Sequence, residues 1–322
     1  MSRFHLVTVS VYLLAQPLWA MDSAQLLQNM SEAMHSKNYS GTFVYRHKNK
    51  VETLKIIHRN TEQGINERVV TLSGKPREII RDESVVTCIW PDNKMVLVDK
   101  TPHNTNRKNR FPGFVLKDLD RLPAYYDLVL APKRSRVASR AAYVVDVKPK
   151  DRFRYGYRLW IDEEAFLLLR SDLLNESGDA VEQVLFTELQ LYDTLPDEAF
   201  APELLAADYE WRETGQATMA KSDDSVRWQT TSLPPGFQLL KHQRRHKGKE
   251  LVSVEHMIFS DGIASVSVFI EQKSKGKSAT RKAGRGALNV YGKQLNGHHI
   301  VVLGEVPGST VKLIADSIEL NQ

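Results

Sequence analysis

Paired acidic residues and paired histidines are the residues of this 322-residue chain whose spacing could support catalysis or metal binding. Glu163-Glu164 and Asp223-Asp224 lie in turn-like segments, so we expect solvated charges and no acid–base dyad. His298 and His299 precede an expected strand, and adjacent residues of a strand point to opposite faces. Their rings would therefore not converge on one metal ion, and the sequence predicts neither a metal nor another cofactor.

Motifs of common enzymes are also missing from the sequence. Gly284-Arg285-Gly286 lacks the GK[ST] and GxGxxG forms of phosphate-binding loops, and no G-x-S-x-G motif occurs. Cys88, the only cysteine, lies in the apolar run of residues 85–90, which predicts a buried small side chain and no reactive nucleophile. We therefore expect no catalytic residues and a protein that is not an enzyme.

Two basic runs in the last third of the chain are candidates for binding. They are residues 241–249 (KHQRRHKGK) and 273–285, and residues 226–322 hold 14 Lys/Arg against 7 Asp/Glu in a chain of net charge +5. No aromatic residue interrupts either run, so nucleic acid is not expected as a partner. Two interpretations remain: solvated hairpin loops, or an electrostatic site for an acidic peptide or lipid phosphates, with Lys241, Arg244 and Arg245 as contacts.

Residues 1–20 have the layout of a secretory signal peptide, with Arg3 and His5 before an apolar run over residues 6–14 and Ala20 at the expected cleavage site. The apolar run is shorter than the roughly 20 residues that a spanning helix needs, so cleavage is favoured over an uncleaved anchor. No other stretch of the sequence could span a membrane. The mature protein is therefore expected in the periplasm.

The first half of the chain predicts a helix followed by a long series of strands. Asp22 or Ser23 can cap a helix over residues 23–34, because Leu26, Met30 and Ala33 recur at helical spacing. About eleven short strands follow between residues 40 and 191, and most of their connections are too short for anything but antiparallel pairing. A sheet that long curls strongly or closes, so we expect an incomplete barrel covered by that helix and by residues 115–126.

The apolar face of this sheet could be a packed core or a lipid-binding surface. In residues 155–161 (YGYRLWI), Tyr157 and Leu159 share one face of a strand. Met-containing stripes are usually core, but the soft thioether also suits a lipid site. Met30, Phe43, Tyr45, Tyr157 and Leu159 are the candidate lining residues.

A linker is expected to separate this half from a smaller α+β module. Residues 214–225 (TGQATMAKSDDS) are small and polar, and Trp228 opens the next apolar region. That module is expected to contain a turn at residues 234–237, several strands, and a final helix capped by Ser309 that turns Val311 and Ile314 toward a core. The predicted boundaries are a signal peptide at 1–20, a first domain at 21–213, the linker at 214–225 and a second domain at 226–322.

Several segments resemble the periplasmic sigma-E regulatory proteins of the RseB (MucB) family. They lie in both halves of the chain and read LDRLPAYYD (119–127), LWID (159–162), LLLRSDLLN (167–175), GDAVEQ (178–183), LPPGF (233–237), FSDG (259–262) and VLGEVP (302–307). The first half alone is similar to the lipoprotein carriers LolA and LolB.

The resemblance implies a fold and a regulatory function. It implies that the first domain is a LolA-like incomplete barrel that senses lipid or lipoprotein acyl chains. It also implies that the smaller domain makes much of the contact with the periplasmic part of a single-pass anti-sigma factor. In the family, that contact shields the anti-sigma factor from proteolysis until a lipid signal releases it. The alternative is a periplasmic carrier of LolA type, which would leave residues 228–322 without a task. The sequence leaves the oligomeric state open.

Overall fold

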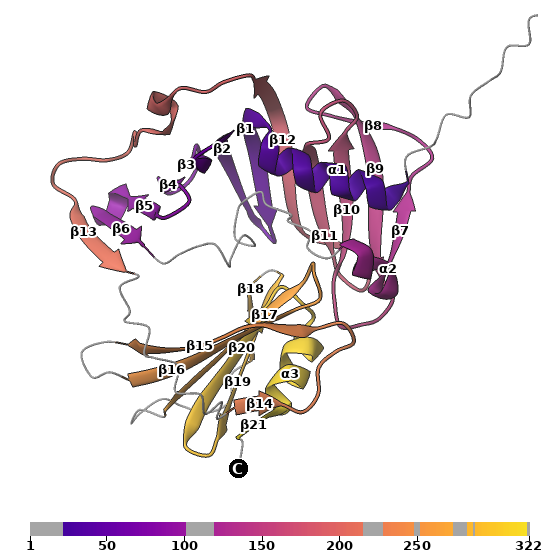
Figure 1. Ribbon diagram of the computed structural model, residues 1–322, viewed down its shortest axis with the longest axis vertical. Coiled ribbons are helices and arrows are strands. Elements are labelled where there is room, and N and C mark those ends of the chain that lie inside the picture. Colours follow the sequence, from indigo (N-terminus) through magenta and orange to yellow (C-terminus); the bar gives the residue numbers. More distant parts are fainter. Residues whose placement is uncertain are drawn as a thin grey trace, which may run out of the picture.

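The computed structural model describes residues 22–100, 119–214, 228–247, 252–272, 282–285 and 287–320, which form a large and a small part (Figure 1). The expected signal peptide and residues 215–225 of the expected linker lie outside these ranges. None of the helices in the described ranges has the length and apolar character that crossing a membrane requires.

A 13-stranded sheet makes up most of the large part. Its order is β13-β6-β5-β4-β3-β2-β1-β12-β11-β10-β9-β7, with β8 paired to β9. The strands are β1 (Asn38–His47), β2 (Lys50–Thr61), β3 (Gly64–Thr71), β4 (Glu78–Arg81), β5 (Val86–Trp90), β6 (Met95–Asp99), β7 (Tyr126–Leu130), β8 (Ser135–Val137), β9 (Arg140–Pro149), β10 (Gly156–Asp162), β11 (Leu168–Leu174), β12 (Ala180–Tyr192) and β13 (Glu210–Thr214).

The topology confirms the coarser prediction of a mostly antiparallel sheet with few helices. All eleven expected strands are present, and β8 and β13 are additional. The sheet is open, since its described end strands β13 and β7 do not pair with each other. Neither strong curling nor an incomplete barrel is established by this pairing.

Helix α1 (Ser23–Ser36) covers part of the sheet (Figure 1). Asp22 caps it, accepting a hydrogen bond from the backbone N–H of Gln25 at 2.7 Å. Leu26, Met30 and Ala33 are buried on one face, as their spacing predicts. Short helical turns complete this part: η1 (Pro91–Asn93), η4 (Leu119–Arg121), α2 (Leu122–Tyr125) and η5 (Asp197–Phe200).

A buried ion pair fixes the segment that connects β12 to β13. Glu78, fully buried, accepts Arg68 Nε at 2.5 Å and the backbone N–H groups of Glu203 and Leu204 at 3.0 and 2.8 Å. Arg68 also donates to the carbonyl of Ala199. The segment is thereby held against the sheet and delivers β13 to β6, the one parallel pairing among the described strands.

The small part has a six-stranded antiparallel sheet packed against one helix. Its order is β15-β16-β17-β20-β19-β18, and a separate pair joins β14 to β21. The elements are β14 (Trp228–Thr230), β15 (Gln238–Lys247), β16 (Val252–Ser260), β17 (Ser265–Gln272), β18 (Lys282–Arg285), β19 (Leu288–Leu295), β20 (His298–Gly304), α3 (Gly308–Asp316) and β21 (Ile318–Leu320). Val311 and Ile314 are buried on the inner face of α3, as expected.

The predicted cap of the final helix is wrong, and the loop interpretation of the basic runs holds only in part. Ser309 does not cap α3: the N-cap residue is Pro307, whose carbonyl accepts the backbone N–H groups of Thr310 and Val311, so Ser309 already lies in the first turn. The basic runs are not only loops, because residues 241–247 form most of β15 and residues 282–285 form β18. Pairing with an apolar neighbouring strand outweighs the polar composition there.

Each part has its own hydrophobic core. The core of the large part contains α1 residues together with Phe43, Leu159 and Phe186. The core of the small part contains Met257, Val268 and Ile314 and shares no buried residue with the first. Ile263, in the β16–β17 turn, packs against the core of the large part. The two parts therefore have separate hydrophobic cores and contact each other at their surfaces.

Candidate functional site at the contact between the two parts

The contact between the two parts is made by loops and element ends. The large part contributes the β9–β10 loop and the start of β7, and the small part contributes the β14–β15 turn, the β16–β17 turn and the first turn of α3. In the β14–β15 turn, Phe237 N–H bonds to the carbonyl of Pro234, and Gly236 has φ +83°, a conformation that favours glycine.

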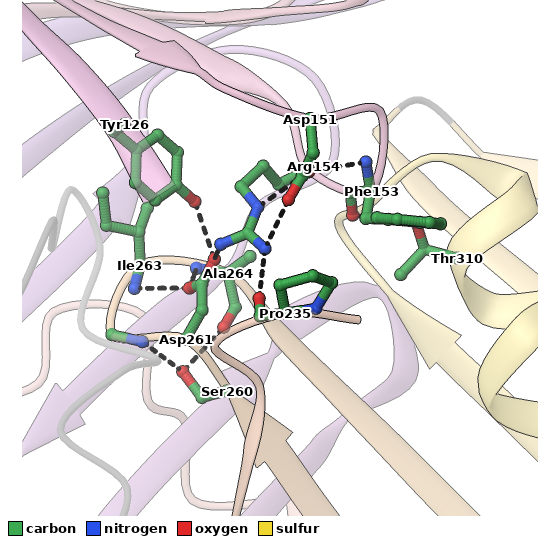
Figure 2. Close-up of polar contacts among 11 residues, drawn as sticks. Tyr126, Asp151, Phe153, Arg154, Pro235, Ser260, Asp261, Ile263, Ala264 and Thr310 are labelled. Carbon is green, nitrogen blue, oxygen red and sulfur yellow. Dashed lines mark hydrogen bonds and ion pairs between the residues drawn. The ribbon is translucent and has the colours of Figure 1, made fainter. Parts of the chain in front are cut away.

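An ion pair between Arg154 and Asp261 lies at the centre of this contact (Figure 2). Arg154 Nη1 is 2.6 Å from Asp261 Oδ2, and both side chains are 0% exposed. Arg154 also pairs with Asp151 of its own loop at 2.9 Å and donates to the carbonyl of Pro235 in the small part. One guanidinium thus binds two separate segments of the small part.

Asp261 is surrounded by hydrogen-bond donors. Its Oδ2 accepts the hydroxyl of Tyr126 at 2.8 Å, and its Oδ1 accepts the backbone N–H groups of Ile263 and Ala264 at 2.9 and 2.7 Å. Burial, followed by the charge of Asp261, raises the pKa of Tyr126 well above its usual range. The phenol therefore stays protonated and acts as a donor to the carboxylate.

Aromatic rings and further hydrogen bonds surround the ion pair between the two parts. The Arg154 guanidinium lies 5.1 Å from the ring centre of Tyr125 and 5.3 Å from that of Phe237, within the range of cation–π attraction. Thr310 Oγ1 donates to the carbonyl of Phe153 at 2.8 Å, and Asn289 donates to the hydroxyl of Tyr155 at 3.1 Å. The contact combines buried charge, aromatic faces and hydrogen bonds.

Two carboxylates influence each other at another point of the contact. Glu182 of β12 lies 3.7 Å from His47, and burial raises its pKa, an effect opposed by a hydrogen bond from Tyr45. Glu305 follows β20 of the small part. Desolvation, and then the charge of Glu182, raise the pKa of Glu305 to about 7, although part of its surface remains exposed. The charge of Glu182 therefore disfavours ionisation of Glu305 across the contact.

The polar side chains around Arg154 bond to groups within the protein. In the described ranges no cluster of three His, Cys, Asp or Glu side chains could hold a metal ion. The side chains around Arg154 are arginine, carboxylate, tyrosine and threonine, all bonded to each other or to backbone groups.

Family models and relatives agree on the identity of the chain. Residues 22–204 match the MucB/RseB N-terminal domain and residues 222–319 match the MucB/RseB C-terminal domain. The chain belongs to the MucB/RseB family. It is 32% identical to the sigma factor AlgU regulatory protein MucB of Pseudomonas aeruginosa, over 93% of this chain and 91% of MucB. It is 27% identical to the sigma-E factor regulatory protein RseB of Escherichia coli K12, over 98% and 96% of the two chains.

Solved structures of a relative extend the agreement to three dimensions. MucB in complex with MucA(peri) is 28% identical and superposes with a TM-score of 0.71, covering 94% of this chain and 100% of that one. The structure of MucB alone gives a TM-score of 0.67 over 94% of this chain and 99% of that one. The relatives are regulatory proteins by name, and both parts of the present fold are covered by the match.

The predicted lipid-lining residues of this MucB/RseB family member come together in space. Met30, Phe43 and Leu159 are 0% exposed and belong to one core beneath α1, and Tyr45 and Tyr157 pack against that core. Their closeness follows from the sequence pattern. That they line a lipid site remains a prediction.

The predicted partner-binding residues do not form one patch. Lys241, Arg244 and Arg245 all lie on β15. Arg244 pairs opposite Glu255 and donates to it at 2.6 Å, on the face that continues the core. Lys241 pairs opposite Ile258, which places it on the other face. Partner binding by these residues also remains a prediction.

Sequence reasoning did not identify Arg154, Tyr126 and Asp261 as a site. Three segments that carry the MucB/RseB resemblance, residues 119–127, 233–237 and 259–262, meet at Arg154. The resemblance of these three segments to one family was the signal in the sequence that pointed to them.

Proposed function

We propose that this chain is a periplasmic regulator that binds the periplasmic domain of a MucA- or RseA-like anti-sigma factor. The observation that supports this most strongly is its similarity, over both parts, to MucB solved in complex with MucA(peri). The absence of enzyme motifs from the sequence agrees with a binding protein. In this role the chain would shield the anti-sigma factor from regulated proteolysis and so act as a negative regulator of the sigma-E response.

We further propose that the large part senses lipid or lipoprotein acyl chains. The open sheet and α1 would then act as an incomplete barrel of LolA type, with Met30, Phe43, Tyr45, Tyr157 and Leu159 in contact with the acyl chain. Burying one methylene contributes about 0.8 kcal/mol, so an acyl chain supplies ample energy to displace α1 side chains.

Release requires that lipid and anti-sigma factor favour different arrangements of the two parts, because a ligand shifts an equilibrium only by its differential affinity. The contact around Arg154 and Asp261 is a suitable element for two such arrangements, since it joins two separate cores. A coupling of about 1–3 kcal/mol between the two ligands would suffice for regulation.

A capture experiment tests the function. The mature chain, immobilised, is exposed to the purified periplasmic domain of a MucA-like protein and then to micelles or vesicles of bacterial lipid. We expect capture of the anti-sigma domain and its loss when lipid is added. Capture of lipoproteins with no binding of the anti-sigma domain would instead favour a carrier of LolA type.

A further inference from the structure

Strand β13 is an open edge of the 13-stranded sheet. In the described part of the chain no strand lies beyond it in the sheet order, and it lies at the left of the large part in Figure 1. The opposite edge, β7, is covered, because α1 lies against it and Ser23 Oγ donates to the carbonyl of Leu128 at 3.3 Å. An edge strand offers backbone N–H and C=O groups with which another strand can pair, and here β13 is the edge that offers them.

The parallel pairing with β6 fixes which backbone groups of β13 point outward. The N–H of Glu210 donates to the carbonyl of Lys94 at 2.7 Å, so Glu210 faces β6. Backbone groups of successive residues in a strand point to opposite sides, so the even-numbered residues of β13 all face β6. Trp211 and Glu213 therefore turn their N–H and C=O groups toward the open edge.

The central side chain of β13 is an exposed aromatic ring. Trp211 is 57% exposed and is the one aromatic residue among the large hydrophobic residues that are exposed in the described ranges. Its register partner is Val96, which in turn pairs with Ile89, and both of these are buried in one small core. Trp211 thus extends an apolar row of the sheet to its edge, and Trp is a residue type enriched at protein interfaces.

The charges of β13 are complementary to a second copy of the same strand. In an antiparallel pair with Trp211 opposite Trp211 of the other copy, Glu210 of each copy lies opposite Arg212 of the other. The outward groups of Trp211 then form a hydrogen-bonded pair, and Glu210 and Arg212 occupy the non-hydrogen-bonded positions, where side chains approach most closely. Within one chain these two side chains pair at 2.9 Å and are still 64% and 59% exposed, so both can reach across the edge.

Other registers and other strands fit this edge less well. A shift of two residues places Arg212 opposite Arg212 or Glu210 opposite Glu210, and like charges directly opposite destabilise a sheet. A shift of one residue sets outward backbone groups against inward ones, so the ladder cannot form. A foreign strand that carries charges of a single sign would meet a like charge at either Glu210 or Arg212.

We propose that β13 is a dimer interface at which a second copy of this chain pairs antiparallel, with Trp211 next to the two-fold axis. Two Glu210–Arg212 pairs flank the axis, and the large sheets of the two copies join edge to edge. The inference goes beyond the proposed function, since it involves neither the anti-sigma factor nor lipid. Because β13 has only five residues, the dimer is expected to be weak and to depend on protein concentration.

Charge reversal tests the interface in the chain alone. Sedimentation velocity is measured from about 1 μM to about 1 mM protein for the wild type, Glu210→Arg and Arg212→Glu. Each variant puts like charges into both flanking pairs, so we expect each to raise the dimer dissociation constant about tenfold or more. The controls Glu176→Arg and Lys133→Glu make the same changes in charge at exposed positions of the large part and should stay within about twofold of the wild type.

A mixture of the two variants tests the register directly. In a mixed dimer the two arginines of one copy lie opposite the two glutamates of the other, so an equimolar mixture of Glu210→Arg and Arg212→Glu should dimerise although each alone does so poorly. Native mass spectrometry identifies the mixed dimer by its mass, and its formation shows that both variants fold.

Three outcomes would overturn the proposal. They are a wild-type chain that stays monomeric over the whole concentration range, a dimer that neither variant weakens, and a mixture that forms no mixed dimer. The anti-sigma domain takes no part in these measurements, so each of the three would leave the proposed function standing.

Discussion

Arg154 is a fully buried cation whose countercharges come from both parts of the molecule. Removing one partner of a buried ion pair typically costs about 3–5 kcal/mol, because the other charge is left without compensation. Separation of the two parts would let water reach Asp261 and relieve that cost. The single guanidinium therefore controls how firmly the parts are joined.

We predict that Arg154→Met opens the contact. Asp261 would keep Tyr126 and two backbone donors but lose its cation, so the radius of gyration from small-angle X-ray scattering should rise and unfolding in urea should begin earlier. Arg134→Met is the matched control, since its pair with Glu163 is 42% and 38% exposed and should contribute at most about 1 kcal/mol. Unchanged scattering for Arg154→Met would contradict the prediction.

We predict that rising pH weakens the contact through Glu182 and Glu305. An acid whose pKa is raised in the joined state favours that state when protonated, so the stabilisation is complete below the ordinary value of 4.5 and is lost as pH rises through about 7. Scattering at about pH 5 should show a more compact protein than at about pH 8. Glu305→Gln should flatten this difference, and an unaltered pH profile in that variant would exclude Glu305 as its cause.

At the level of elements, Glu78 joins β4 to the segment that precedes β13. We predict that Glu78→Ala leaves Arg68, 4% exposed, without its main countercharge and costs about 3–5 kcal/mol in urea unfolding. Residues 193–209 should become sensitive to limited proteolysis. The control Glu52→Ala breaks an ion pair that is 39% exposed on both sides and should change little. Equal stability of the two variants would show that the segment is held by other contacts.

The sequence predicted the helices and strands whose apolar residues recur periodically. It did not predict the strands that form only because another strand pairs with them. The stripe of Leu26, Met30 and Ala33 marks α1, and alternating residues between turn signals mark the eleven strands. β13 reads EWRET, is exposed throughout, and exists only because β6 pairs with it in parallel across a long connection. β15 is basic, so its composition indicates a loop until the pairing with β16 is known.

The candidate site was less predictable than the fold. Arg154 and Asp261 are 107 positions apart, and nothing local in the sequence states which of many Arg and Asp residues will meet. The lipid-lining residues were predictable as a group because strand alternation places them on one face. A pairing between two domains depends on how they dock, which no periodicity encodes.

At the scale of the whole molecule, a substitution at Gly236 tests whether the two parts must stay in contact. A Cβ there would lie 2.6 Å from the ring of Tyr125, so we predict that Gly236→Ala pushes the parts apart and increases the radius of gyration. Gly74→Ala is the matched control: its φ of +78° is close to the +83° of Gly236, but a Cβ there would meet nothing within 4 Å. Both variants pay about 1 kcal/mol for the left-handed backbone, and only Gly236→Ala adds a clash. Equal scattering of the two variants would show that the turn adjusts locally.

The polar character of the contact also affects the protein's solubility while the parts are separated. Separating Arg154 from Asp261 exposes charged groups that water hydrates readily. Separating an apolar interface would instead expose a hydrophobic surface prone to aggregation. Each core stays intact on its own side. Separation of the two parts would therefore expose hydrated groups beside the rings of Tyr125 and Phe237, and less apolar surface than the opening of a wholly apolar interface.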